Sequence, residues 1–250
     1  MNGNQELFEF NFYEWEKQLK DKPYLRQPIG DKWEEYTWGE VGDMARRLAT
    51  GLKSLNLRER AHIGIYSKNC REWIIADLAI VMAGYISVPF FPSLNGKELA
   101  YIMDYGDVDA LFVGKIETWD DIKDDLPEEM ALIKFPQYAG CSNVTKGREW
   151  SEFINSHKPM QNPHMPKLSD LWTIIFTSGT TGNPKGVMLS YQAIHGIKVV
   201  LDDPENPLGI KHDGNNEFIS YLPLNHIFER VVIEWTSFRY GGTISFVESI

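Results

Sequence analysis

Between residues 61 and 135 the sequence alternates short β-branched runs with longer helical patterns, and few architectures accommodate such an alternation. Strands are expected at 61–66, 86–91, 110–114 and 131–135, and helices at 71–83 and 95–105. The helix at 71–83 is apolar on almost every side, which is typical of a deeply buried helix. Because strands joined by helices run parallel, we predict an α/β fold of mostly parallel sheets with helices on both faces.

Three elements are predicted before this alternation begins. An amphipathic helix is expected at 9–20, and a hairpin follows with Gly30-Asp31 at its turn. The next helix is expected to start at Thr37. Thr37 and Glu40 are spaced as a capping box, in which each side chain accepts a bond from the other residue's backbone N–H.

The stretch at 158–167 holds three prolines and looks like a linker or a long surface loop. We therefore predict a first α/β subdomain at 1–160 and the start of a second at 161–250. Beyond the linker the sequence predicts strands at 171–176, 218–222 and 243–247, a helix at 191–201 capped by Ser190, and an amphipathic helix at 224–239 after Pro223.

Composition and charge argue against some classes of function. The chain has 250 residues, of which 43% are hydrophobic, so it can bury a sizeable core. Its formal net charge of −10 argues against nucleic acid as a partner. Cys70 and Cys141 lack metal or redox spacing and residues 1–5 lack a secretory pattern, so a cytoplasmic location is expected. The apolar stretch at 74–91 contains Asp77 and a proline, which indicates a buried helix and strand rather than a membrane span.

Residues 177–186 lie between two apolar runs and are rich in groups that bind anions. They include three glycines, four hydroxyl side chains and one lysine, Lys185, but no carboxylate. Backbone N–H groups, hydroxyls and a mobile cation together suit a polyphosphate. A polar hairpin turn uses the same residue types, but it does not require so many in series or the absence of acid. The order Lys185-Gly186 excludes a Walker A loop, in which glycine precedes lysine.

The sequence Ser-Gly-Thr-Thr-Gly-Asn-Pro-Lys-Gly at 178–186 resembles the phosphate loop of the adenylate-forming superfamily of acyl-CoA synthetases, luciferases and peptide-synthetase domains. The stretch at 221–230 resembles the second core motif of that superfamily, in the form carried by long-chain fatty acid–CoA ligases. Residues 36–40, 69–73 and 88–94 look like further landmarks in the right order. The resemblance covers nearly the whole chain, and it implies part of the large N-terminal domain of such an enzyme.

This resemblance implies an ATP-dependent, AMP-forming acid–thiol ligase. A fatty acid carboxylate would attack the α-phosphate of Mg-ATP, giving acyl-AMP and pyrophosphate, and the thiol of coenzyme A would then displace AMP. Lys185 is implied as a catalytic cation on the departing pyrophosphate, and Thr180 as a hydroxyl near Mg²⁺. The residues implied to cradle the ATP phosphates, together with Lys185, are Thr177, Ser178, Gly179, Thr180, Thr181 and Gly182.

The resemblance also implies that His226 lines the acyl site and takes part in catalysis. Pro223 is expected to open a helix, which puts His226 in the first turn. Glu229 and Arg230 follow three and four residues later, so we expect them to share its face and to contribute to substrate binding. A structural histidine beside a surface ion pair is the alternative for this group.

Later landmarks of the family are missing: a Tyr-Gly-x-Thr-Glu segment, a Thr-Gly-Asp segment and a small C-terminal domain with its catalytic lysine. We therefore expect an N-terminal fragment of a long-chain fatty acid–CoA ligase that does not form acyl-CoA alone. Two alternatives stay open, a relative that binds nucleotide or acyl chains without catalysis and a ligase for another carboxylic acid. The expected partners are fatty acid, ATP and coenzyme A. Peripheral membrane contact would suit a lipid substrate, but no amphipathic basic helix supports it, and the sequence does not fix the oligomeric state.

Overall fold

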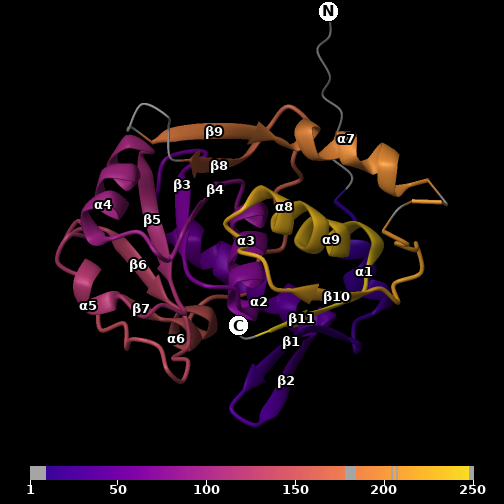
Figure 1. Ribbon diagram of the computed structural model, residues 1–250, viewed down its shortest axis with the longest axis horizontal. Coiled ribbons are helices and arrows are strands. Elements are labelled where there is room, and N and C mark those ends of the chain that lie inside the picture. The colour runs from indigo at the N-terminus through magenta and orange to yellow at the C-terminus, as the bar shows by residue number, and fades with distance from the viewer. Residues whose placement is uncertain (1–9, 178–183, 204, 207, 248–250) are drawn as a thin grey trace, which may run out of the picture.

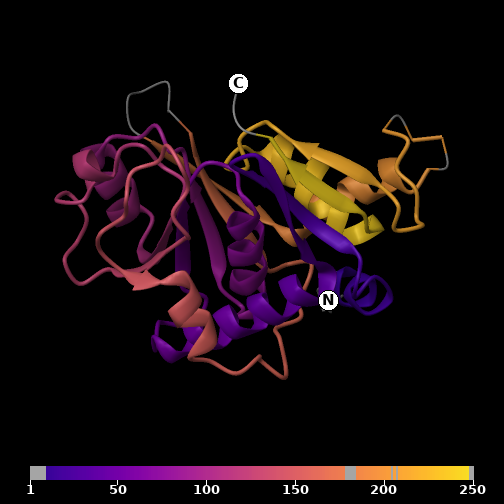
Figure 2. The same cartoon turned by 90° about the horizontal axis from the view of Figure 1, so that it is seen from below.

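The computed structural model describes residues 10–177, 184–203, 205–206 and 208–247. Within these residues the strands form a seven-stranded sheet, here the large sheet, and a four-stranded sheet, here the small sheet. Figures 1 and 2 show the two sheets with α2 and α3 at their junction. The mixed α/β class predicted from the sequence is confirmed.

The large sheet has the order β7–β6–β5–β3–β4–β8–β9. Its strands are β3 (His62–Tyr66), β4 (Ile86–Phe90), β5 (Val108–Val113), β6 (Ala131–Lys134), β7 (Arg148–Glu149), β8 (Leu171–Thr177) and β9 (Lys185–Ser190). Neighbouring strands run parallel except β8 and β9, which are antiparallel. The stretch that resembles a phosphate loop therefore connects β8 to the edge strand β9.

The small sheet has the order β10–β11–β1–β2. Its strands are β1 (Pro23–Ile29), β2 (Lys32–Thr37), β10 (Glu217–Ser220) and β11 (Thr243–Phe246). The hairpin predicted around Gly30-Asp31 is confirmed, because β1 and β2 pair antiparallel. The boundary predicted near residue 160 does not separate the two sheets, since β8 pairs with β4 and β11 pairs with β1. Strands from both sides of that boundary thus build each sheet.

The helices fill the connections between strands. They are α1 (Phe12–Gln18), α2 (Trp38–Ser54), α3 (Arg71–Met82), α4 (Gly96–Tyr105), α5 (Trp119–Ile122), α6 (Trp150–Asn155), α7 (Tyr191–Leu201), α8 (Ile227–Glu229), the π-helix η1 (Arg230–Trp235) and α9 (Thr236–Tyr240). The prediction of an amphipathic helix at 224–239 is therefore wrong in two respects. The observed helical segment begins at Ile227, and its middle is a π-helix whose charged residues Arg230 and Glu234 are buried.

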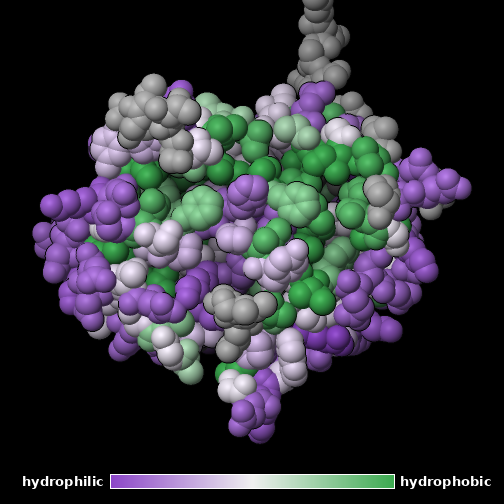
Figure 3. Space-filling view, in the orientation of Figure 1, coloured by the Kyte–Doolittle hydropathy of each residue, from purple (hydrophilic) through white to green (hydrophobic). Residues whose placement is uncertain are grey.

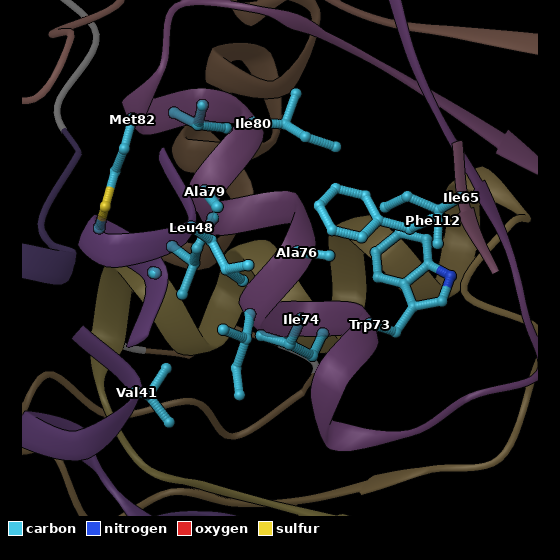
Figure 4. Close-up of a cluster of buried hydrophobic side chains, with 14 of the residues drawn as sticks. Val41, Leu48, Ile65, Trp73, Ile74, Ala76, Ala79, Ile80, Met82 and Phe112 are labelled. Carbon is cyan, nitrogen blue, oxygen red and sulfur yellow. The ribbon is translucent and has the colours of Figure 1, made fainter. Parts of the chain in front are cut away.

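Helix α3 lies at the centre of the larger hydrophobic core, and every one of its residues is buried. Figure 4 shows Trp73 of α3 beside Ile65 and Phe112, which belong to β3 and β5 of the large sheet. Val41 and Leu48 of α2 lie on the other side of the helix (Figure 4). A helix covered on both sides needs no polar face, which explains its nearly continuous apolar sequence.

The predicted cap of α2 is present with both of its bonds. The Thr37 hydroxyl accepts from the Glu40 N–H at 3.2 Å, and the Glu40 carboxylate accepts from the Thr37 N–H at 2.8 Å. Ser190 occupies the N-cap position of α7 as predicted, but its side chain makes no capping hydrogen bond.

This difference predicts unequal effects of two similar substitutions. Thr37→Ala is expected to lower the free energy of unfolding by about 1 kcal/mol, because it leaves a helix N–H without its acceptor. Ser190→Ala, the matched control, removes a hydroxyl that makes no such bond and should change stability less. Urea denaturation of both variants tests this, and equal losses would contradict it.

The surface carries an uneven distribution of apolar side chains. In Figure 3 hydrophobic residues gather over the centre and upper part of the face drawn, whereas the left and lower margins are mostly hydrophilic. The large apolar side chains that are exposed include Tyr101, Tyr105, Met188, Tyr221 and Phe228. In the part of the chain that the structure describes, no helix is long and apolar enough to cross a bilayer.

Candidate functional site

The two described ends of the phosphate-loop stretch face each other. Thr177 ends β8, Lys185 begins β9, and the two residues are partners in the antiparallel register. Both are exposed, so their side chains are accessible to a ligand in solution. The other predicted phosphate-binding residues lie outside the described residues: Ser178, Gly179, Thr180, Thr181 and Gly182.

Gly186 explains how β9 can lie so close to its neighbour. A Cβ atom added at this position would meet Ile174 Cγ2 at 3.0 Å and the Phe176 ring at 3.2 Å. Such contacts are tighter than ordinary van der Waals packing, so a side chain at 186 would require Ile174 or Phe176 to shift by a few tenths of an ångström. The glycine next to Lys185 thus fits the close packing of side chains on this face of the hairpin.

A large pocket, here the apolar pocket, opens between α4 and the β8–β9 hairpin. Its volume is about 870 Å³, within the range of small-molecule sites. The lining is predominantly apolar, and the apolar residues in it are Pro89, Phe90, Phe91, Leu94, Tyr101, Ile102, Ile175, Phe176, Pro184, Val187, Leu189 and Ile227. Thr177 and His226 also line it. The pocket therefore joins an apolar chamber to the base of the predicted phosphate loop.

His226 lies at the wall of this pocket but not in a helical turn. Its backbone N–H donates to the Pro223 carbonyl at 2.9 Å, so Pro223 opens a turn and the helix begins one residue after His226. The imidazole Nδ1 accepts from the Phe228 N–H at 3.3 Å. With Nδ1 as acceptor, the neutral ring carries its proton on Nε2, which is the donor that a carboxylate oxygen requires.

Glu229 and Arg230 do not share a face with His226, and that prediction is wrong. His226 is exposed, whereas Glu229 and Arg230 are buried. The Glu229 carboxylate accepts from the Tyr221 N–H at 3.0 Å, and Arg230 is paired with Asp77. Neither belongs to the lining of the apolar pocket, so their positions do not support direct contact with a substrate.

Burial also affects the ionisation of Glu229. Removal from water raises the pKa of its carboxyl above the ordinary value, while hydrogen bonds from Ser220 and from the backbone at Tyr221 and Leu222 oppose that rise. These bonds tie the carboxyl to the end of β10. Glu229 thus serves to hold the stretch at 221–230 in place.

Three stretches that the sequence marks separately are brought together here. The Asn69 side chain donates to the Leu222 carbonyl at 2.6 Å and accepts from the Leu224 N–H at 2.8 Å. Asn225 is buried, and its side chain donates to the Phe90 carbonyl at 2.9 Å. The landmark stretches at 69–73, 88–94 and 221–230 therefore meet around one end of the apolar pocket.

Several pocket residues were not predicted from the sequence. Tyr101 and Ile102 belong to α4, and Val187 and Leu189 to β9, where they look like ordinary amphipathic positions. The stretch at 88–94 was marked only as a landmark, yet it contributes Phe90, Phe91 and Leu94. The lining comes from β4, α4, β8, β9 and α8, so no single one of these elements carries a signal for it.

No group of three or more His, Cys, Asp or Glu side chains is arranged for a metal among the residues that the structure describes. Thr180, the hydroxyl predicted near Mg²⁺, lies outside them.

Comparison with known proteins finds a family match and relatives over most of the chain. The family description "AMP-binding enzyme" matches residues 12–250. Long chain acyl-CoA synthetase 4 of Arabidopsis thaliana is 31% identical over an alignment of 239 positions, which covers 88% of this chain and 35% of that protein. Long-chain-fatty-acid–CoA ligase 1 of Homo sapiens is 28% identical over an alignment of 243 positions, which covers 91% of this chain and 33% of that protein. The chain thus spans about a third of the length of such relatives.

Solved structures share the fold. The anthranilate CoA ligase AuaEII, in complex with anthranoyl-AMP, superposes with a TM-score of 0.77 at 20% identity, over 95% of this chain and 45% of that one. ATP-bound MatB from Rhodopseudomonas palustris superposes with a TM-score of 0.73 at 19% identity, over 96% of this chain and 45% of that one.

Proposed function

The chain belongs to the AMP-binding enzyme family, and we propose that it supplies the acyl pocket and part of the ATP site of a long-chain fatty acid–CoA ligase. The substrates of such a ligase are a fatty acid, ATP with Mg²⁺, and coenzyme A. The relatives named long-chain acyl-CoA synthetases support this choice of substrate.

The observation that carries the proposal is the composition of the apolar pocket. An alkyl chain needs an apolar chamber, and a carboxylate needs a hydrogen-bond donor at its end. The pocket offers the first along α4 and the β8–β9 hairpin, and His226 Nε2 offers the second. Thr177 lies in the same lining, so the carboxyl end of a bound acid would approach the phosphate loop.

The proposed reaction has two steps. A carboxylate oxygen attacks the α-phosphorus of ATP, the bond to the bridging oxygen breaks, and pyrophosphate leaves with acyl-AMP remaining. The sulfur of coenzyme A then attacks the acyl carbon, AMP leaves, and the thiol proton is released. Positioning and charge stabilisation contribute most to chemistry of this kind, so no protein nucleophile is required.

The roles proposed for individual residues follow from this scheme. Lys185 would neutralise charge on the pyrophosphate as it leaves, and His226 would orient the carboxylate. Thr177 and the loop residues after it would bind the β- and γ-phosphates, with Thr180 near Mg²⁺. Mg²⁺, bound with the nucleotide, would supply further charge neutralisation at the phosphates.

We also propose that the polypeptide 1–250 does not complete this reaction alone. It lacks the motifs through which the family is expected to hold adenine and ribose and to supply the C-terminal lysine. Those contacts would have to come from other parts of a whole protein that carries this chain.

The test is ATP–pyrophosphate exchange with a series of acids. A whole protein carrying this chain should support exchange with palmitate far better than with benzoate or hexanoate, and the polypeptide 1–250 should support none. Preference for an aryl or short acid would replace the fatty acid assignment. Clear exchange by the polypeptide 1–250 would contradict the claim that it cannot carry out the reaction alone.

Filling the apolar pocket should weaken binding of a long acyl chain. Val187 lines the pocket, so Val187→Trp would exclude part of the chain from it. Losing burial of two methylenes, at about 0.8 kcal/mol each, corresponds to roughly a tenfold loss of affinity. Fluorescence titration of the polypeptide 1–250 with 11-(dansylamino)undecanoic acid measures this loss.

Met188→Trp is the matched control for this prediction. Val187 and Met188 are both exposed residues of β9, but only Val187 belongs to the described lining of the apolar pocket. The control should bind the dansyl acid like the wild type. Equal weakening by both tryptophans would mean that the dansyl acid does not occupy the pocket.

A further inference from the structure

Arg230 is joined through the backbone to the histidine of the proposed acyl site. Its N–H donates to the His226 carbonyl at 3.3 Å, and it is the first residue of the π-helix η1. His226 is exposed at the pocket, whereas the Arg230 side chain is 0% exposed. One short segment thus carries an exposed side chain at the pocket and a buried one in the core.

The buried guanidinium bonds to two elements far away in the sequence. Its Nη2 atom donates to both carboxylate oxygens of Asp77 in α3, at 2.8 and 2.7 Å. Its Nη1 atom donates to the Thr173 hydroxyl of β8 at 2.8 Å. The ring of Trp172 lies 4.1 Å from the guanidinium carbon and that of Trp73 lies 5.3 Å from it, so the group is enclosed by aromatic faces.

The bond to Thr173 connects Arg230 with the phosphate strand. Thr173 belongs to β8, the strand that ends at Thr177 beside the phosphate loop. The Thr173 hydroxyl in turn donates to the Ser87 carbonyl of β4 at 2.7 Å. A continuous set of hydrogen bonds thus runs from the His226 segment through Arg230 to the strand that presents the loop.

A second carboxyl group, that of Glu234, lies beside the Asp77–Arg230 pair. Glu234 lies one turn later, and its carboxyl is 3.3 Å from the Arg230 Nε atom. Burial and the charge of Asp77 raise the pKa of Glu234 well above its ordinary value, which favours its neutral form. Asp77 and Arg230 then form a matched pair. A π-helix is less favourable than an α-helix and persists only where tertiary contacts hold it.

We propose that Arg230 is a positioning residue that fixes His226 relative to the phosphate strand β8. This inference rests on the proposed function, in which His226 orients the carboxylate that must meet the phosphate held by the loop after β8. A misplacement of about 1 Å between reacting groups can lower a rate by about 10²-fold. The buried hydrogen bond from Arg230 to Thr173 thus holds the His226 segment and strand β8 in a fixed relative position.

The first test follows the His226 ring itself, without any ligand. The polypeptide 1–250 with ¹³C-labelled histidine gives ring signals, and the His226 signal is identified by its loss in His226→Ala. Asp77→Leu/Arg230→Met removes the pair without leaving an unpaired buried charge. Thr173→Val keeps the pair but removes the bond from Arg230 to β8, together with the bond from the Thr173 hydroxyl to the Ser87 carbonyl. Both variants should shift or broaden the His226 signal, while the signals of His62 and His157 remain.

The matched control removes a different ion pair, Glu16 with Arg46, whose side chains are partly buried. Glu16→Gln/Arg46→Met should leave the His226 ring signal unchanged. If the ring signal stays in place in folded Asp77→Leu/Arg230→Met, the positioning role is wrong. If it also moves in the control, the shift reflects a general loss of structure and again contradicts the proposal.

The second test compares 11-(dansylamino)undecanoic acid with its methyl ester. The wild type should prefer the acid by about tenfold, as expected for one hydrogen bond to a charged group. His226→Ala and Asp77→Leu/Arg230→Met should both lose this preference while binding the ester normally. A double variant that keeps the preference would overturn the positioning role. A wild type without preference would instead overturn the proposed role of His226, and the ring signal would still decide the question of positioning.

Discussion

Replacing Lys185 with alanine is expected to lower adenylate formation by about 10²-fold or more in a whole protein that carries this chain. Lys185 begins β9 opposite Thr177, and its side chain is exposed at the loop end of the hairpin. A cation there would stabilise charge that develops on pyrophosphate as it leaves. ATP–pyrophosphate exchange with palmitate measures the effect.

Lys32→Ala is the control for Lys185→Ala. Lys32 is also an exposed lysine in a strand, but it lies in the β1–β2 hairpin of the small sheet. Its removal should leave the exchange rate unchanged. An unchanged rate in Lys185→Ala itself would remove this lysine from the proposed mechanism.

The largest expected effect on stability is that of Arg230→Met. The substitution leaves the Asp77 carboxylate buried without its partner, which costs about 3–5 kcal/mol of unfolding free energy. Adding Asp77→Leu should recover most of that loss, because two apolar side chains can replace a buried ion pair at little cost. Urea denaturation of the polypeptide 1–250 measures both values.

Arg230→Lys separates charge from geometry in this cluster. A lysine keeps a positive charge near Asp77, but it cannot bond to Asp77, Thr173 and Glu234 together as the guanidinium fork does. We expect stability between that of the wild type and that of Arg230→Met. If Arg230→Met were as stable as the wild type, the buried pair would not hold the π-helix in place.

Local sequence signals predicted much of the fold because the interactions behind them are local. Thr37 and Glu40 form the capping box that their spacing predicts, and Asn95 and Glu98 form a second one at the start of α4. The continuous apolar sequence of α3 predicted a deeply buried helix, and the structure confirms it. The boundary predicted near residue 160 does not separate the two sheets, because strands from either side of it pair with each other. Such long-range pairing cannot be inferred from the local composition of a proline-rich stretch.

The errors around His226 have a different cause. Pro223 can open either a turn or a helix, and the local sequence does not choose between them. Arg230 was expected to share the face of His226 because residues four apart in a helix lie on the same face. Its partners, Asp77 and Thr173, come from distant positions that the packing of α3 and β8 brings together. No spacing within 221–230 could reveal them.

The central claim is that an acyl chain occupies the apolar pocket, and photo-crosslinking tests it most directly. The polypeptide 1–250 would be irradiated with a palmitate analogue that carries a diazirine near its methyl end. We predict adducts on residues of α4 and β9 that line the pocket, such as Tyr101, Ile102 and Leu189, and their loss in excess palmitate. Adducts that palmitate does not displace, or that lie in a second pocket whose lining includes Arg60 and His164, would contradict the claim.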